Sequence, residues 1–229
     1  AFTALYFPEK PCYNQWTKKH KKRQNGMKIA EVKREGAQQL VPLYEGQGHR
    51  IVDSFLQGIM GRAWAVFEGN GQEGKAVSAL ILVGDFLFPA GRPQKELAER
   101  MEDCMGSGFA LAVPKGAGWR ELIEGQFPGR FRRQTRYAMQ KNRDGFDTDR
   151  LKRFAGQPPA GFSLQPVDKN WFERLKEEEW SKDFVSQFSD YEQYSRCGGG
   201  FLAVEEKTGE AVSGASSYIV YRDGLEIEV

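Results

Sequence analysis

The sequence predicts an α+β protein with mainly antiparallel sheets flanked by helices, divided into two halves. Apolar runs of strand length are separated by short glycine-rich turns, which is typical of antiparallel hairpins. Stretches with helical spacing lie between those runs. The segment 157–161, Gln-Pro-Pro-Ala-Gly, is typical of a domain boundary. We therefore expect an N-terminal α+β domain over 27–155 and a second domain over 162–229.

The composition excludes several classes of protein. A formal net charge of +2 gives no overall attraction for a polyanion. The three cysteines, Cys12, Cys104 and Cys197, are widely spaced, and only two histidines accompany them, so we expect neither a disulfide framework nor a metal site. No run approaches the roughly 18 apolar residues of a membrane span, and no signal peptide is recognisable. A cytoplasmic protein with reduced thiols is expected.

Residues 1–26 differ from the rest of the chain. A basic cluster, Lys18 to Arg23, precedes Gln24-Asn25-Gly26, and an amphipathic pattern begins at Met27. We interpret this segment as a basic leader that is disordered or non-native, with Met27 as the natural start. A nucleic-acid-binding arm is the alternative.

The first half alternates between helical and strand periods. Residues 38–59 predict two helices joined by a bend at Gly46–Gly48. The residues between Gly69 and Gly74 are typical of a hairpin between two apolar strands. The other expected elements are strands over 63–68, 76–88 and 109–113, and helices over 93–104 and 118–127.

Basic residues recur from Arg130 to Arg153, with Phe131 and Tyr137 among them. Such a stretch could hold a single-stranded nucleic acid or the 3′-phosphate of coenzyme A. The simpler interpretation is a solvated helix face followed by a linker, because three aspartates between 144 and 149 dilute the charge.

The second half has the sharper order. Residues 162–167 alternate like a strand, and Asp168 stands where a helix N-cap is expected. A long helix should follow and end before Gly198–Gly200, its buried face formed by Trp171, Leu175, Trp180, Phe184, Val185 and Phe188. Three antiparallel strands are predicted over 201–205, 211–221 and 225–229.

The chain contains no GxSxG elbow, no HExxH and no Walker loop. The glycine run Gly198–Gly200 could cradle a phosphate, but glycines between a helix and a strand are more typical of a connection. The sequence alone therefore identifies no nucleophile and no phosphate-binding loop.

Three segments resemble one known family. Phe201–Val204, Glu210–Tyr218 and Gly224–Val229 resemble the GNAT superfamily of N-acetyltransferases, in the bacterial branch that includes the zwittermicin A resistance acetyltransferase. Gly84–Phe86 and Arg133–Ala138 resemble the N-terminal part of that branch. The resemblance implies a GNAT-like fold and transfer of an acetyl group from acetyl-CoA, the cosubstrate, to a primary amine. The amine would attack the thioester directly, in a ternary complex.

The resemblance also implies a site. In this family the pantetheine arm lies along the fourth strand, which corresponds to 225–229, so Ile227, Glu228 and Val229 are expected to contact acetyl-CoA. Side chains alternate along a strand, which places Glu226 and Glu228 on one face. We expect Glu226 to be the general base, with Glu228 as second candidate. The alternative is two surface glutamates, and Tyr218 and Tyr221 are either wall residues or acids.

Two further expectations complete the prediction. The family's glycine-bearing pyrophosphate loop should follow this strand, so we expect the 229 residues to be C-terminally incomplete and to bind acetyl-CoA weakly or not at all. The acyl acceptor is expected to be a small-molecule or peptide amine, with no membrane partner. The alternative function is a non-catalytic acyl-CoA or nucleic-acid binding module that uses the stretch 130–153.

Overall fold

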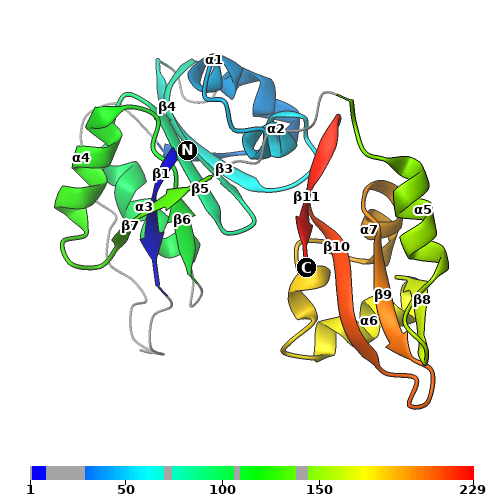
Figure 1. Ribbon diagram of the computed structural model, residues 1–229. Helices are drawn as coiled ribbons and strands as arrows, with labels where there is room; N and C mark the ends of the chain where they lie inside the picture. The colour runs from blue at the N-terminus through cyan, green and yellow to red at the C-terminus, as the bar shows by residue number, and fades with distance from the viewer. Residues whose placement is uncertain (1, 9–28, 70–73, 106–108, 138–143) are drawn as a thin grey trace. The chain divides into compact units, whose positions relative to one another are not determined.

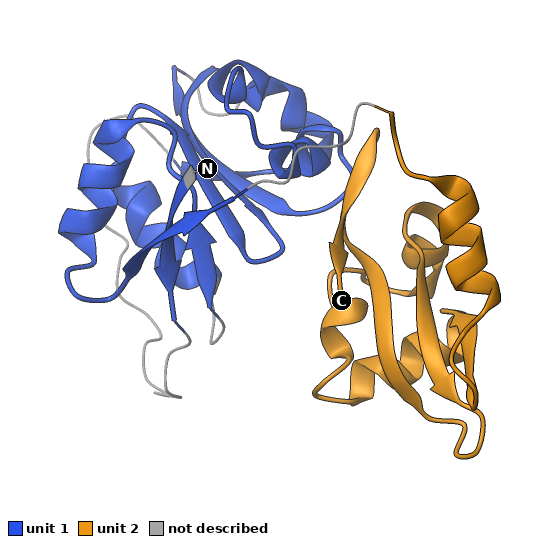
Figure 2. Ribbon diagram, viewed as in Figure 1, with its two compact units in different colours: residues 1–138 blue, residues 139–229 orange. Residues whose placement is uncertain are grey.

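The computed structural model describes residues 2–8, 29–69, 74–105, 109–137 and 144–229 (Figure 1). The chain forms two compact units, Ala1–Ala138 (unit 1) and Met139–Val229 (unit 2), and each contains its own sheet (Figure 2). The division falls earlier than the proline-rich segment 157–161, so the helix that precedes this segment belongs to unit 2.

Unit 1 contains a seven-stranded sheet in the order β2-β3-β4-β5-β6-β1-β7. Neighbouring strands are antiparallel except for β5 and β6, which are parallel. The predicted strand 76–88 is two strands, because the chain turns at Gly84, where φ is +55°. The strands are β1 (Phe2–Phe7), β2 (Ile29–Val32), β3 (Arg62–Glu68), β4 (Lys75–Val83), β5 (Phe86–Gly91), β6 (Ala110–Ala112) and β7 (Arg132–Arg136).

Strand β1 corrects the expectation of a disordered leader. Its residues 2–7 lie between β6 and β7, where Leu5 pairs with Ala112 on one side and with Arg133 on the other. Ala4, Leu5 and Phe7 are buried. The interpretation of 1–26 as unstructured is therefore wrong for these six residues, because burial between two strands stabilises so short a run. The rest of the leader, with the basic cluster and the expected start at Met27, lies outside the described residues.

Strand β7 corrects the reading of the basic stretch as a helix face. All five of its residues are exposed, and it pairs only with β1 among the described strands. An edge strand rich in arginine has no buried face that would produce an apolar period, and charged side chains protect such an edge from further pairing.

Helices cover both faces of this sheet (Figure 1). Helices α3 (Lys95–Met105) and α4 (Ala117–Gln126) pack on one face, where the buried cluster includes Trp64, Leu80 and Trp119. The other face is covered by η1 (Arg34–Leu40), α1 (Val41–Tyr44) and α2 (Ile51–Leu56). There the buried Tyr44 hydroxyl donates a hydrogen bond to the Phe88 carbonyl at 2.7 Å.

Unit 2 contains a four-stranded antiparallel sheet in the order β11-β10-β9-β8. The strands are β8 (Phe162–Pro166), β9 (Gly200–Glu205), β10 (Ala211–Tyr221) and β11 (Gly224–Glu228), and the helices are α5 (Thr148–Gly156), α6 (Lys169–Glu177), η3 (Lys182–Phe184) and α7 (Tyr191–Cys197). The predicted order of one strand, a helical region and three antiparallel strands is confirmed, as is the α+β class with a mainly antiparallel sheet.

The helical region of unit 2 is interrupted. The N-cap is as predicted, since the Asp168 carboxylate accepts a hydrogen bond from the Trp171 N–H at 2.8 Å. The single long helix is wrong: α6 ends at Glu177, and η3 and α7 follow as separate elements. Adjacent glutamates at 177–179 place negative charge at the C-terminal end of α6, where the helix dipole disfavours it. Trp180 follows the interruption and is exposed rather than buried.

Candidate active site

The hairpin of β10 and β11 brings the predicted site residues together. Tyr221 pairs with Gly224 at the turn, and a Cβ on residue 224 would lie 2.9 Å from Cε2 of Tyr221. Glycine therefore leaves room for the tyrosine ring beside the turn. The Tyr221 hydroxyl donates a hydrogen bond to Oε1 of Glu226 at 3.2 Å. Sequence reasoning named both residues but did not predict this contact, which orients the carboxylate.

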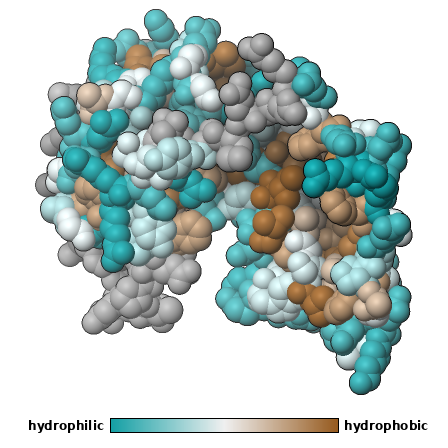
Figure 3. Space-filling model, viewed as in Figure 1, coloured by the Kyte–Doolittle hydropathy of each residue, from teal (hydrophilic) through white to brown (hydrophobic). Residues whose placement is uncertain are grey.

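The two faces of β11 differ in exposure. Glu226 and Glu228 are half-buried, whereas Leu225, Ile227 and Val229 are 43%, 63% and 84% exposed. Figure 3 shows apolar surface over the hairpin that contains this strand. A simple solvated strand would place its glutamates on the more exposed face. The arrangement is the reverse, and it leaves the carboxylates beside the buried Ile219 and Ser216, which stand opposite them on β10.

Strand β11 lies at one edge of its sheet. Among the described strands only β10 pairs with it. The register of β10 against β11 shifts between Ser217 and Ile219, which is a β-bulge at Tyr218. Bulges increase the local twist and re-aim side chains. An edge strand next to a bulge can accept an extended ligand as an added strand would pair with it.

The glycine run Gly198–Gly200 leads into β9, and packing requires two of its three glycines. A Cβ on Gly200 would lie 2.7 Å from the Tyr194 hydroxyl oxygen, and one on Gly198 would lie 2.8 Å from the Phe188 ring. The Ser217 hydroxyl accepts from the Gly199 N–H at 3.1 Å and donates to its carbonyl at 2.9 Å. These contacts fix the connection against β10, and packing accounts for Gly198 and Gly200 without a bound phosphate, whereas a Cβ on Gly199 would meet no atom within 4 Å.

The cysteines that the structure describes are poor nucleophiles. Burial raises the pKa of the Cys104 thiol from 9.0 to about 12, and burial also raises the pKa of Cys197. Thiolate, not thiol, attacks an acyl group, so neither residue suits a covalent acyl-enzyme at neutral pH. Within the described part of the chain, no group of three or more His, Cys, Asp and Glu side chains could hold a metal ion.

Thiol labelling tests whether the Cys104 thiol is buried and unreactive. We expect Cys104 in the folded protein at pH 8 to react with iodoacetamide at least about 100-fold more slowly than in the urea-unfolded chain, because almost no thiolate forms below its raised pKa. Mass spectrometry of the Cys104 peptide over time measures both rates. Equal rates in the two states would contradict the burial of this thiol.

The basic stretch is divided and partly neutralised. Arg130 donates to Glu102 at 2.7 Å, and Arg133 makes two hydrogen bonds to Glu124, at 2.8 and 2.7 Å. The Arg133 hydrogen bonds lower the pKa of Glu124. The part of the basic stretch from Thr148 onward lies in α5, which belongs to unit 2. These ion pairs reduce the charge available to a polyanion along this stretch.

Comparison with known proteins identifies the family. A sequence model described as GNAT acetyltransferase matches residues 41–229, and the chain belongs to this family. A crystal structure of a GCN5-related N-acetyltransferase-like protein from Streptococcus suis 89/1591 is 32% identical, with a TM-score of 0.71 over 86% of this chain and 76% of that one. The comparison with curated proteins finds no match.

A second solved structure is more distant. It is a tandem GNAT protein from the clavulanic acid biosynthesis pathway, 14% identical with a TM-score of 0.37, covering 87% of this chain and 80% of that chain. In the part of the chain that the structure describes, no helix has the length and apolar character needed to cross a bilayer.

Proposed function

We propose that this protein transfers an acetyl group from acetyl-CoA to a primary amine by direct attack in a ternary complex. The observation that carries the proposal is the half-buried Glu226 carboxylate, which Tyr221 orients in the β10–β11 hairpin. The family is one of acetyltransferases, and a carboxylate that could take a proton from an amine supports this chemistry here.

The backbone and the side chains at the end of β11 have different roles in this proposal. The backbone groups of Ile227, Glu228 and Val229 would hold the pantetheine arm, and acetyl-CoA supplies an acyl group activated as a thioester. Glu226 would take one proton from the ammonium group, after which the amine nitrogen forms the new C–N bond while the C–S bond breaks. CoA leaves as a thiolate, which takes up the second proton that the nitrogen gives up. Glu228, on the same face, is the second candidate for the base.

The acceptor would be a small-molecule or peptide amine in the cytoplasm. The ion pairs of Arg130 and Arg133 do not favour the alternative of a non-catalytic acyl-CoA or nucleic-acid binding module.

Release of the CoA thiol tests the function. We expect a chromogenic thiol reagent to detect CoA when the protein is mixed with acetyl-CoA and a panel of primary amines. Tertiary amines of matched size should give no release, because they have no N–H to lose. Binding of acetyl-CoA without release by any amine would instead favour the binding module.

A further inference from the structure

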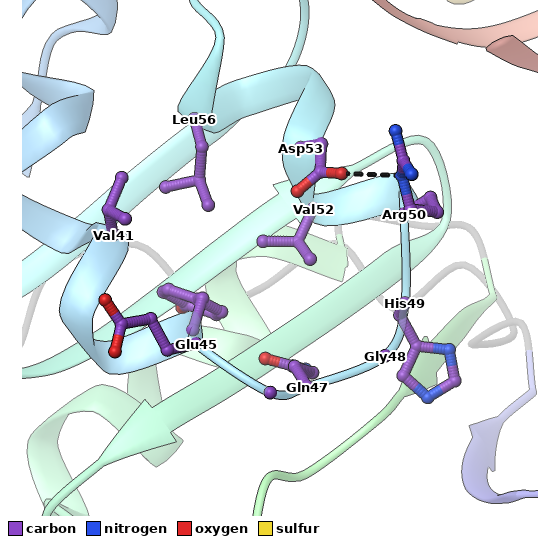
Figure 4. A pocket seen from close by; sticks show the side chains of 11 residues that line it. Val41, Glu45, Gln47, Gly48, His49, Arg50, Val52, Asp53 and Leu56 are labelled. Atoms are coloured by element: carbon purple, nitrogen blue, oxygen red, sulfur yellow. Dashed lines mark ion pairs between the residues drawn. The ribbon is translucent and has the colours of Figure 1, made fainter. Parts of the chain in front are cut away.

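Two glycines of this chain serve different purposes. Gly48, in the loop 45–50 that joins α1 to α2, has a φ of +75°, and a Cβ there would meet no atom within 4 Å (Figure 4). Such a position needs glycine for its backbone conformation. Gly224 is the opposite case, because its φ lies outside the left-handed region and a Cβ there would meet the side chain of Tyr221. The hairpin therefore needs glycine at 224 for a neighbouring side chain and not for its backbone.

The three atoms nearest to a Cβ on residue 224 would all belong to Tyr221. They are Cε2 at 2.9 Å, and Cζ and the hydroxyl oxygen at 3.4 Å. A ring at the end of a side chain can move aside more easily than backbone. We therefore expect Gly224→Ala to displace the tyrosine ring and to leave the hairpin folded.

A displaced ring would carry its hydroxyl away from Glu226. Tyr221 pairs with Gly224 across the hairpin, and Glu226 lies two residues further along β11 on the same face. The tyrosine thus reaches the carboxylate diagonally, over the position where residue 224 has no side chain. Its hydroxyl donates to Oε1 at 3.2 Å, and no described residue donates to Oε2. The hydrogen bond distinguishes the two oxygens and leaves Oε2 for an incoming proton.

We propose that Tyr221 and Gly224 are positioning residues for the proton transfer to Glu226, an inference that rests on the function proposed above. Gly224 leaves the space that the ring of Tyr221 occupies. The tyrosine hydroxyl holds Oε1, so that Oε2 takes the proton from the ammonium group of the acceptor. Both residues act through the carboxylate, and their effect on the rate depends on its presence.

Steady-state kinetics of single and double variants test the proposal. Tyr221→Phe and Gly224→Ala should each lower kcat about 10- to 100-fold, because a hydrogen bond to a charged group is lost, and leave the KM for acetyl-CoA within about twofold. In the Glu226→Gln background both substitutions should change the remaining rate by less than about twofold, because no base is left to position. Equal losses with and without the Glu226 carboxylate would overturn the proposal.

Tyr191→Phe and Gly156→Ala are the matched controls. Tyr191, in α7, is half-buried like Tyr221, and a Cβ on Gly156, at the end of α5, would meet no atom within 4 Å. Both variants should keep near-normal kcat, and circular dichroism melting checks that every variant folds. If Glu226→Gln keeps full turnover, the proposed base is wrong and this inference falls with it. If Glu226→Gln loses turnover and Tyr221→Phe does not, only this inference is wrong.

Fluorine NMR follows the contact itself, without turnover. With 3-fluorotyrosine in place of tyrosine, the resonance of residue 221 is assigned by its loss in Tyr221→Phe. It should move in Gly224→Ala and in Glu226→Gln, and stay in place in Gly156→Ala. A resonance that does not move in Gly224→Ala would show that the ring keeps its place beside an alanine, and the proposal would be wrong.

Discussion

Replacing Glu226 by glutamine is expected to lower the turnover of the acetyltransferase by ~10²- to 10⁴-fold. Glutamine keeps the size of the side chain and can still accept the Tyr221 hydrogen bond, which measures 3.2 Å in the wild-type protein. It cannot accept a proton from an ammonium group. The defect should shrink as pH rises, because more of the amine is then already neutral and needs no base. Steady-state rates of the wild type and the variant across pH measure both effects.

Glu228→Gln is the matched control, since this residue lies on the same face of the same strand. It should retain near-normal turnover if Glu226 is the base. Both variants should still bind acetyl-CoA, because the cosubstrate is expected to use the backbone of β11. A loss confined to Glu228→Gln would exchange the two roles. Full activity in both would assign the proton transfer to water or to another residue.

The second half of the fold could be predicted closely from local signals. Asp168 provides an N-cap, and glycines stand at the ends of elements, as at Gly209, where φ is +71°. Each signal acts over a few residues, so one sequence is enough to recognise it. The interruption of the helix after Glu177 was missed because the apolar spacing continues through it.

The strands of unit 1 that were not predicted depend on pairing between residues far apart in the chain. Leu5 in β1 pairs with Ala112 and Arg133, more than a hundred residues away in sequence. A six-residue run predicts a strand only weakly, and nothing within it indicates that two partners exist. Strand β7 was missed for a further reason: its residues are all exposed, so the sequence shows no apolar alternation there.

The site divides in a similar way. Alternation along β11 was enough to place Glu226 and Glu228 on one face, because that depends only on strand geometry. The hydrogen bond from Tyr221 depends on the two-residue turn and on the space that Gly224 leaves, which the residue pattern does not encode.

Replacing Trp119 by alanine is expected to lower the free energy of unfolding by about 3–5 kcal/mol. The side chain is only 1% exposed and lies in the cluster that joins α4 to the sheet. Its indole N–H donates to the Gly91 carbonyl at 3.0 Å. Gly91 itself is held at a φ of +79°, and a Cβ there would lie 2.4 Å from the Val77 carbonyl oxygen. The indole thus fills the core and satisfies the carbonyl of a residue that must be glycine.

Urea titration followed by far-ultraviolet circular dichroism measures the loss in the free energy of unfolding. It does not rely on tryptophan fluorescence, which the substitution itself changes. Trp180→Ala is the matched control, because that side chain is 50% exposed and its truncation should cost clearly less. Trp119→Phe separates the two contributions, since it restores most of the packing and removes the hydrogen bond to Gly91. If the free energy of unfolding of Trp119→Ala were within about 1 kcal/mol of the wild-type value, the packing of α4 on the sheet would be weaker than the burial of Trp119 indicates.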